Sequence, residues 1–113
     1  MLELITAIIK PHKLDDVKDA LLANGVKGVT ITEVRGFGRQ GGKTEVFRGS
    51  EYSIDFVPKI RLEIIVQASE VQSLIDVIVR TARTERIGDG KVWSMSISNL
   101  TRVRTGETGA EAI

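Results

Sequence analysis

The sequence predicts one α+β domain in which a single sheet is covered by two helices. Three observations favour this class. The chain has 113 residues, enough for one core; its two halves repeat one pattern; and each half holds strand-like and helix-like periodicities in the same order. The predicted order is β-α-β-β-α-β, which the ferredoxin-like sandwich satisfies. In that arrangement the first and third strands lie at the centre of the sheet.

The first half begins with a β-rich run at residues 2–10. A helix follows, because three apolar residues recur on one helical face: Leu14, Val17 and Leu21. Asn24-Gly25 predicts its end, since glycine tolerates the left-handed conformation of a C-cap. The β-branched run at residues 29–34 predicts the second strand.

The second half repeats this order. Residues 59–67 alternate like a strand with one apolar face, formed by Ile60, Leu62, Ile64 and Val66. Ser69 and Gln72 have the spacing of a capping box. The helix after them carries the stripe Val71, Leu74, Ile75 and Ile78. A turn at Gly88-Asp89-Gly90 leads to the last strand at residues 92–100.

The first strand is apolar on both faces. Leu2, Leu4 and Ile8 lie on one, and Ile5, Ala7 and Ile9 on the other. Two helices cover only one face of such a sheet, so a second copy of the chain is the simplest cover for the other. The alternative is that some aliphatic side chains are simply exposed, which is common.

Composition excludes several function classes. Sixteen Lys and Arg against fifteen Asp and Glu leave a net charge of +1, so any anion site must be local. The absence of cysteine excludes a disulfide scaffold, thiolate metal sites and thiol catalysis. The single histidine, His12, excludes a multi-histidine metal site within one chain. The sheet lacks the paired aromatics of an RNA-binding sandwich. No secretion signal or membrane-spanning segment is predicted, so we expect a cytoplasmic protein.

The connection at residues 38–57 is far longer than a hairpin needs. It is rich in glycine and charge, and it holds Ser50 beside the only tyrosine, Tyr52. It is either a solvated loop or a protruding partner-binding arm whose tip can be modified, and the length favours the arm. Residues 36–41 spell G-x-G-x-x-G, but no helical pattern follows, so we reject a dinucleotide fold.

Two basic clusters favour a polyphosphate. Gly88-Asp89-Gly90-Lys91 combines permissive backbone with an ammonium. Arg102 and Arg104 are two residues apart, so in an extended segment their guanidiniums point the same way and suit phosphate oxygens. No Walker motif is present, which argues against a P-loop hydrolase.

At this point the chain resembles the PII nitrogen-regulatory signal-transduction proteins over essentially its whole length. The resemblance rests on Ile8-Ile9-Lys10-Pro11, Leu14-Asp15-Asp16-Val17, residues 32–40, Arg48-Gly49-Ser50-Glu51-Tyr52, Thr84 with residues 87–91, and residues 102–107. It implies a single domain at 1–113 that forms a homotrimer, with a partner-binding loop at 38–57, a nucleotide-binding turn at 84–91 and a nucleotide-contacting C-terminal segment at 101–113. Glu85 departs from the family, which commonly has glycine there.

The resemblance also implies ligands. ATP or ADP would bind in clefts between subunits. The adenine side would be formed by Gly28, Thr30, Glu63 and Ile65, and the phosphate side by Gly38, Arg39, Gly88, Gly90, Lys91, Arg102 and Arg104, with Asp89 also at the site. With Mg²⁺ and ATP, 2-oxoglutarate would bind at Gln40, Gly42 and Lys59, and Gln40 would also ligate Mg²⁺. Tyr52 matches a tyrosine that many members nucleotidylylate, and Ser50 a serine that one branch phosphorylates.

The function expected is therefore a sensor of nitrogen, carbon and energy status rather than an enzyme. The implied partners are an ammonium transporter and enzymes that control glutamine synthetase and nitrogen transcription. The protein would reach a membrane only by binding such a transporter. No nucleic-acid partner is expected. Two other functions stay open at this stage: a slow nucleotide-hydrolysing enzyme, and a structural adaptor that is indifferent to ligands.

Overall fold

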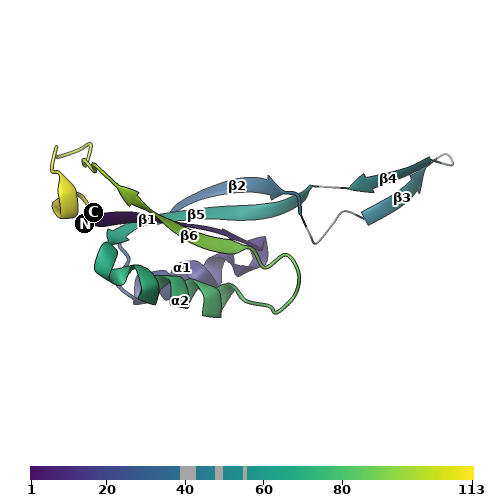
Figure 1. Ribbon diagram of the computed structural model, residues 1–113, viewed down its shortest axis with the longest axis horizontal. Coiled ribbons are helices and arrows are strands. Elements are labelled where there is room, and N and C mark those ends of the chain that lie inside the picture. The colour runs from purple at the N-terminus through teal and green to yellow at the C-terminus, as the bar shows by residue number, and fades with distance from the viewer. Residues whose placement is uncertain (39–42, 48–49, 55) are drawn as a thin grey trace.

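The structure confirms the predicted α+β sandwich. The computed structural model describes residues 1–38, 43–47, 50–54 and 56–113, the two short ranges as backbone only. The strands and helices are β1 Leu2–Ile9, α1 Leu14–Ala23, β2 Thr30–Gly36, β3 Lys43–Phe47, β4 Ser50–Ile54, β5 Val57–Gln67, α2 Val71–Ala82 and β6 Lys91–Ile97 (Figure 1). Without β3 and β4, which lie in the long connection, the order is the predicted β-α-β-β-α-β.

The four long strands form one antiparallel sheet in the order β2-β5-β1-β6. The first strand and the strand after the long connection are therefore central, as predicted. Leu4 lies opposite Ile65 of β5 and Met95 of β6. This register leaves Leu4 on one face of the sheet and Ile5 on the other.

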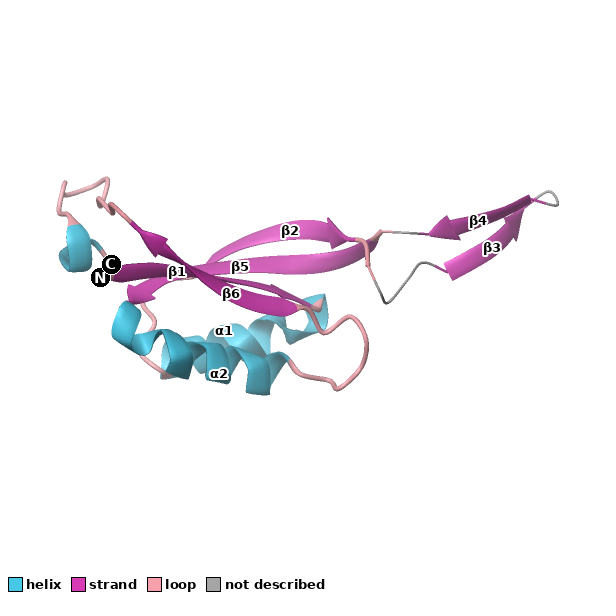
Figure 2. Cartoon of the chain, in the orientation of Figure 1, coloured by secondary structure: helices cyan, strands magenta, loops and turns pink. Residues whose placement is uncertain are grey.

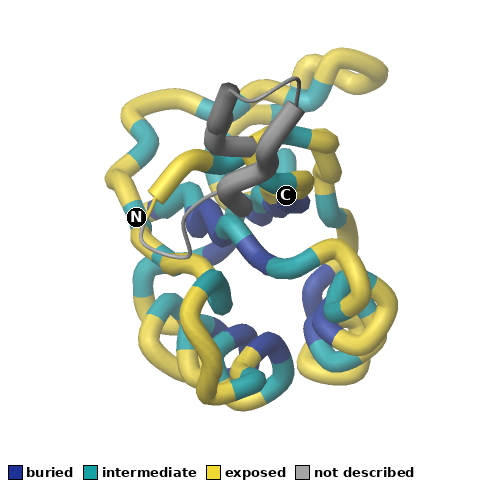
Figure 3. Tube along the Cα trace, turned by 90° about the vertical axis from the view of Figure 1, so that its right-hand side faces the viewer, coloured by how far each residue is buried: buried dark blue, intermediate teal, exposed yellow. Residues whose placement is uncertain are grey.

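Both helices lie on the same side of the sheet (Figure 2). Ile5, Ala7 and Ile9 point to that side and are fully or almost fully buried. The alternating residues of β5 are also buried, as are four residues of the helical stripes, where the two layers meet (Figure 3): Ile60, Leu62, Ile64, Val66, Val17, Leu21, Leu74 and Ile78. Leu14, Val71 and Ile75 of these stripes are half-buried and pack against this core. The hydrophobic effect acting on these residues fixes the sandwich.

Helix α1 begins and ends as predicted. A 3-10 turn, η1 (Pro11–Lys13), leads into it, and Asn24 caps it before Gly25 at φ +90°. The predicted capping box of α2 is wrong. Ser69 lies inside a 3-10 turn, η2 (Ala68–Glu70), and Glu70 occupies the N-cap without a side-chain hydrogen bond. The turn brings the chain from β5 into α2 and leaves Ser69 one residue too early to cap.

The other sheet face carries no helix. Trp93 and Met95 of β6 are 41% and 60% exposed on it, and Leu4, Ile8 and Ile65 beside them are half-buried. A face with these side chains is the uncovered surface that the sequence predicted. We call it the open face.

The long connection forms a second small sheet. β3 pairs with β4 antiparallel, Glu45 opposite Tyr52, and the hairpin projects beyond the main sheet (Figure 1). The molecule is accordingly elongated, 61 × 27 × 21 Å. At the root of this arm the Phe37 and Phe56 rings lie 6.1 Å apart, with the Arg35 guanidinium 5.8 Å from the Phe56 ring centre.

Candidate functional site

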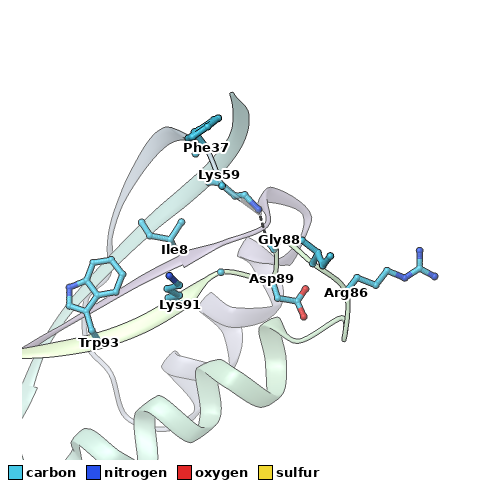
Figure 4. A pocket seen from close by; sticks show the side chains of 12 residues that line it. Ile8, Phe37, Lys59, Arg86, Gly88, Asp89, Lys91 and Trp93 are labelled. Atoms are coloured by element: carbon cyan, nitrogen blue, oxygen red, sulfur yellow. Dashed lines mark hydrogen bonds between the residues drawn. The ribbon is translucent and has the colours of Figure 1, made fainter. Parts of the chain in front are cut away.

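Glycines and cations surround a cavity of about 540 Å³, which we call cavity 1. It lies at the end of the sheet from which the arm projects, beside the turn between α2 and β6 (Figures 1 and 4). Its walls include six residues predicted for ligand binding: Gly38, Lys59, Gly88, Asp89, Gly90 and Lys91. The described part of the chain thus brings the glycine-rich turn and Lys59 together.

Lys59 is the buried cation of cavity 1. Only 6% of its surface is exposed, and its Nζ donates a hydrogen bond to the Gly88 carbonyl (Figure 4). Gly36 leaves room for it, since a Cβ at that position would lie 3.3 Å from Lys59 Cγ. Burial lowers the pKa of Lys59, and the Lys10 ammonium lowers it further, against an opposing effect of Asp89. An ammonium held in this way favours an anionic ligand.

Asp89 organises the turn between α2 and β6. Its Oδ2 accepts hydrogen bonds from the backbone amides of Thr84 at 2.8 Å and Glu85 at 2.9 Å. Its Oδ1 accepts one from the Thr84 hydroxyl and lies 3.3 Å from Lys10 Nζ. Partial burial alone would raise the pKa of Asp89, but the hydrogen bonds from Thr84, Lys10 and Glu85 outweigh it and hold the pKa well below the ordinary 3.8. Asp89 is therefore an ionised group that the turn itself uses.

Gly90 is the point at which this turn touches β1. Its φ is +99°, and a Cβ there would lie 1.7 Å from the Ile8 carbonyl oxygen. Only glycine fits such a position. Gly88, at φ +96°, is also left-handed. Glycines in this arrangement leave backbone N–H groups accessible, which is how a concave anion site is made without a helix N-terminus.

A second cavity, of about 330 Å³, lies on the open face and reaches the C-terminus. We call it cavity 2. The four residues predicted for the adenine side all line it: Gly28, Thr30, Glu63 and Ile65. Register explains their convergence, because Thr30 lies opposite Glu63 and Leu4 opposite Ile65. An apolar floor with a carboxylate at its edge suits a flat heterocycle that carries N–H donors.

Arg102 and Arg104 do not lie in an extended segment, which is the condition under which their guanidiniums would point the same way. The chain reverses direction there, closed by hydrogen bonds from Arg102 N to Glu107 O and from Gly106 N to Arg102 O, both 2.8 Å. Gly106 permits the reversal at φ +74°. The Arg102 guanidinium bonds Glu107 at 2.7 Å and the carbonyls of residues 111 and 113 at 3.1 and 3.0 Å, so it holds the C-terminus against cavity 2. Arg104 is exposed.

Within one chain, then, the described residues of the predicted phosphate side fall into two separate groups. The turn at 84–91 borders cavity 1, whereas Arg102 belongs to the end of the sheet that holds both termini (Figure 1). Arg39, Gln40 and Gly42 lie outside the described residues. Ser50 and Tyr52 lie in β4, where only the backbone is described.

Sequence reasoning gave no role to Lys10 or Trp93, and none to Thr84 beyond its place in the predicted turn at 84–91; the structure places all three at the site. Lys10 Nζ donates to Thr84 Oγ1 at 3.0 Å across 74 positions of sequence, and Trp93 lines cavity 1. Lys10 and Thr84 stand in the motifs that carry the family resemblance, and that was the one signal pointing to them.

Among the described residues, no group of three or more His, Cys, Asp and Glu side chains is arranged to hold a metal ion. In that same part of the chain no helix has the length and apolar character needed to cross a bilayer.

Comparison with known proteins gives a consistent result. The profile of the family described as "Nitrogen regulatory protein P-II" matches residues 2–107. Nitrogen regulatory protein P-II 1 of Escherichia coli (strain K12) is 52% identical over 109 residues, which are 96% of this chain and 97% of that protein. Nitrogen regulatory protein P-II of Azospirillum brasilense is 51% identical with the same coverage. The crystal structure of Arabidopsis thaliana PII bound to citrate matches with a TM-score of 0.82 and 38% identity, over 99% of this chain and 92% of that one.

Proposed function

The chain belongs to the nitrogen regulatory protein P-II family and is therefore a non-catalytic regulator of nitrogen metabolism, and from this premise we propose that it senses ATP, ADP and 2-oxoglutarate as a cytoplasmic homotrimer. Membership in this family excludes the alternative function of a nucleotide-hydrolysing enzyme. The proposal concerns which ligands carry the signal and where they bind.

One observation supports it above the others: the predicted base side lines one cavity of the chain, and four described residues of the predicted phosphate side line another, namely Gly38, Gly88, Gly90 and Lys91. Cavity 2 offers Glu63, Thr30 and Ile65, and cavity 1 offers Lys91 with the glycine turn. A nucleotide would use both halves if cavity 1 of one subunit faced cavity 2 of the next. The open face, with its exposed Trp93 and Met95, is the surface that such an assembly would cover.

We propose that 2-oxoglutarate binds beside the phosphates, at Lys59, Gln40 and Gly42. A buried ammonium suits a dianion, and the Arabidopsis relative was crystallised with citrate, another carboxylate. Mg²⁺ takes oxygen ligands. Since the described residues hold no acidic cluster for it, its ligands would come from the phosphates, the keto acid and Gln40. This explains why the keto acid would bind only with Mg²⁺ and ATP.

The arm at residues 38–57 would carry the output. Gln40 lies near the start of the arm and Lys59 lies just past its end, so a ligand that contacts both can favour one arrangement of the arm over another, and with it partner affinity. The proposed partners are an ammonium transporter and enzymes that control glutamine synthetase and nitrogen transcription. Tyr52 is the proposed site of nucleotidylylation, with Ser50 the less favoured site of phosphorylation.

Calorimetry and native mass measurement on the purified chain test the proposal. We expect a trimer that binds one ATP per subunit. Lys91→Met should weaken ATP binding by about 1.5–3 kcal/mol, the size of a hydrogen bond to a charged group. Lys18→Met, which removes a lysine of α1 outside both cavities, should leave it unchanged. A monomer that binds neither ATP nor ADP would end the proposal.

Two further measurements address its parts. Gln40→Ala should keep ATP binding and lose 2-oxoglutarate binding; an unchanged keto-acid affinity would refute the assignment of Gln40. Proteins captured from cell extract should differ between ADP and the combination of Mg²⁺, ATP and 2-oxoglutarate. Capture that ignores all three ligands would favour the structural adaptor instead.

A further inference from the structure

The turn that borders cavity 1 is held by a compact polar cluster of three side chains, which we call the Thr84–Asp89–Lys10 clasp. The Thr84 hydroxyl donates to Asp89 Oδ1 and accepts from Lys10 Nζ at 3.0 Å. Lys10 Nζ also lies 3.3 Å from Asp89 Oδ1. A hydroxyl is the only group at position 84 that does both, because it has one hydrogen to give and lone pairs to receive. The clasp therefore ties the end of β1 to both ends of the turn.

The turn needs such support because part of its backbone adopts an unfavourable conformation. Glu85 has φ +63°, a conformation that residues with a Cβ rarely adopt. Its amide is one of the two that bond Asp89 Oδ2, at 2.9 Å. Gly90 then brings the backbone against the Ile8 carbonyl. Strain of this kind persists only where surrounding contacts impose it, and it is concentrated at functional sites.

The clasp also affects the position and surroundings of the buried Lys59 ammonium. The Gly88 carbonyl, between Glu85 and Gly90 in the same turn, accepts the hydrogen bond from Lys59 Nζ. Asp89 attracts the Lys59 ammonium, whereas Lys10 repels it. If the clasp opened, Gly88 would move and Lys59 would face Lys10 without the compensating carboxylate.

We propose that the Thr84–Asp89–Lys10 clasp is a positioning device that sets the glycine turn and the Lys59 ammonium together in the arrangement that accepts the nucleotide's phosphates. The proposal rests on the nucleotide binding proposed above and assigns Asp89 a different role in it. Both Asp89 oxygens are engaged inside the turn, so Asp89 acts through the backbone it folds. Lys10 and Thr84 likewise act without contacting the ligand.

The test compares three threonine variants of the full chain, with ATP and ADP affinities measured by calorimetry at one chain concentration. Thr84→Val keeps the side-chain shape and removes both hydrogen bonds; ATP affinity should fall about tenfold. Thr84→Ser keeps the hydroxyl and should restore binding to within about twofold of the unaltered chain. Thr81→Val removes a hydroxyl that bonds the Val77 carbonyl within α2, outside the clasp, and should bind ATP normally.

Fluorescence supplies a second readout. Trp93 is the only tryptophan in the chain and lines cavity 1, so ATP should change its emission in the unaltered chain. Thr84→Val should need about ten times more ATP for the same change. If Thr84→Val does not fold, Lys10→Met takes its place, since Lys10 belongs to the clasp but lies outside the turn itself. The ATP affinity of this variant should fall at least threefold.

The outcomes separate the two proposals. If the unaltered chain binds no nucleotide, the proposed function fails and the role of the clasp fails with it. If the unaltered chain binds ATP and Thr84→Val (or Lys10→Met) binds it equally well, the clasp alone is overturned. Loss in Thr84→Val without recovery in Thr84→Ser would also overturn it, because the hydroxyl would then not be the group responsible.

Discussion

Replacing Gly90 by alanine should destabilise the fold by about 2–5 kcal/mol. Two effects contribute. A residue with a Cβ costs about 1–2 kcal/mol at a left-handed φ such as the +99° of Gly90. The new Cβ would also lie 1.7 Å from the oxygen and 2.7 Å from the carbon of the Ile8 carbonyl, which are backbone atoms of a central strand. Crowding that a packed interior cannot relax costs about 1–3 kcal/mol more.

Urea unfolding measures this cost, and the chain concentration is held fixed because the stability of the proposed trimer would depend on it. Gly25→Ala is the matched control. Gly25 has φ +90°, but among the described residues nothing lies within 4 Å of the place that a Cβ would take there, so only the conformational cost of about 1–2 kcal/mol applies. A Gly90→Ala variant that is no less stable than Gly25→Ala would show that the turn does not press on β1, and the reasoning would be refuted.

Three other outcomes follow from the same turn and its surroundings. Glu85→Gly should stabilise the protein by about 0.5–1 kcal/mol in urea unfolding, since relief of the positive φ exceeds the added chain entropy of glycine; a less stable variant would contradict it. Because the pKa of Asp89 is lowered in the folded state, its stabilising effect is complete above about pH 4 and is lost as the pH falls. Acid titration should therefore destabilise the unaltered chain more than Asp89→Asn. Parallel curves of unfolding free energy against pH for the two proteins would contradict this. Because the pKa of Lys59 is also lowered, 2-oxoglutarate affinity should fall with rising pH before an ordinary lysine would lose its charge. Lys59→Arg should flatten that pH dependence in calorimetry. A pH-independent affinity in the unaltered chain would exclude Lys59 as the cation that binds 2-oxoglutarate.

The sequence was sufficient to predict the two-layer sandwich, because the period at which apolar residues recur indicates which residues are buried. The alternating residues of β5 became core where the pattern placed them, as did Leu74 and Ile78 of the α2 stripe, whereas Val71 and Ile75 pack half-buried against the core. The uncovered face was also predictable, since β1 is apolar on both sides. The hairpin inside the arm was not, because Gly and charged residues there obscure the alternation of short strands.

Contacts between distant parts of the chain could not be predicted from the sequence. Nothing local to Lys10 or Thr84 indicates that they meet, because the contact depends on how β1 and the turn pack. The reversal at Arg102 was missed for a related reason: spacing predicts a shared side only if the backbone is extended, and Gly106 lets it turn. The capping box failed because η2 inserts a tight turn before α2.

The separation of cavity 1 from cavity 2 has a genetic consequence. In the proposed trimer, a chain damaged only at Lys91 and another damaged only at Glu63 would each fail when alone, because every cleft between subunits would contain one faulty wall. Expressed together, the two defective alleles would complement each other, since a mixed ring contains one junction at which both intact walls meet.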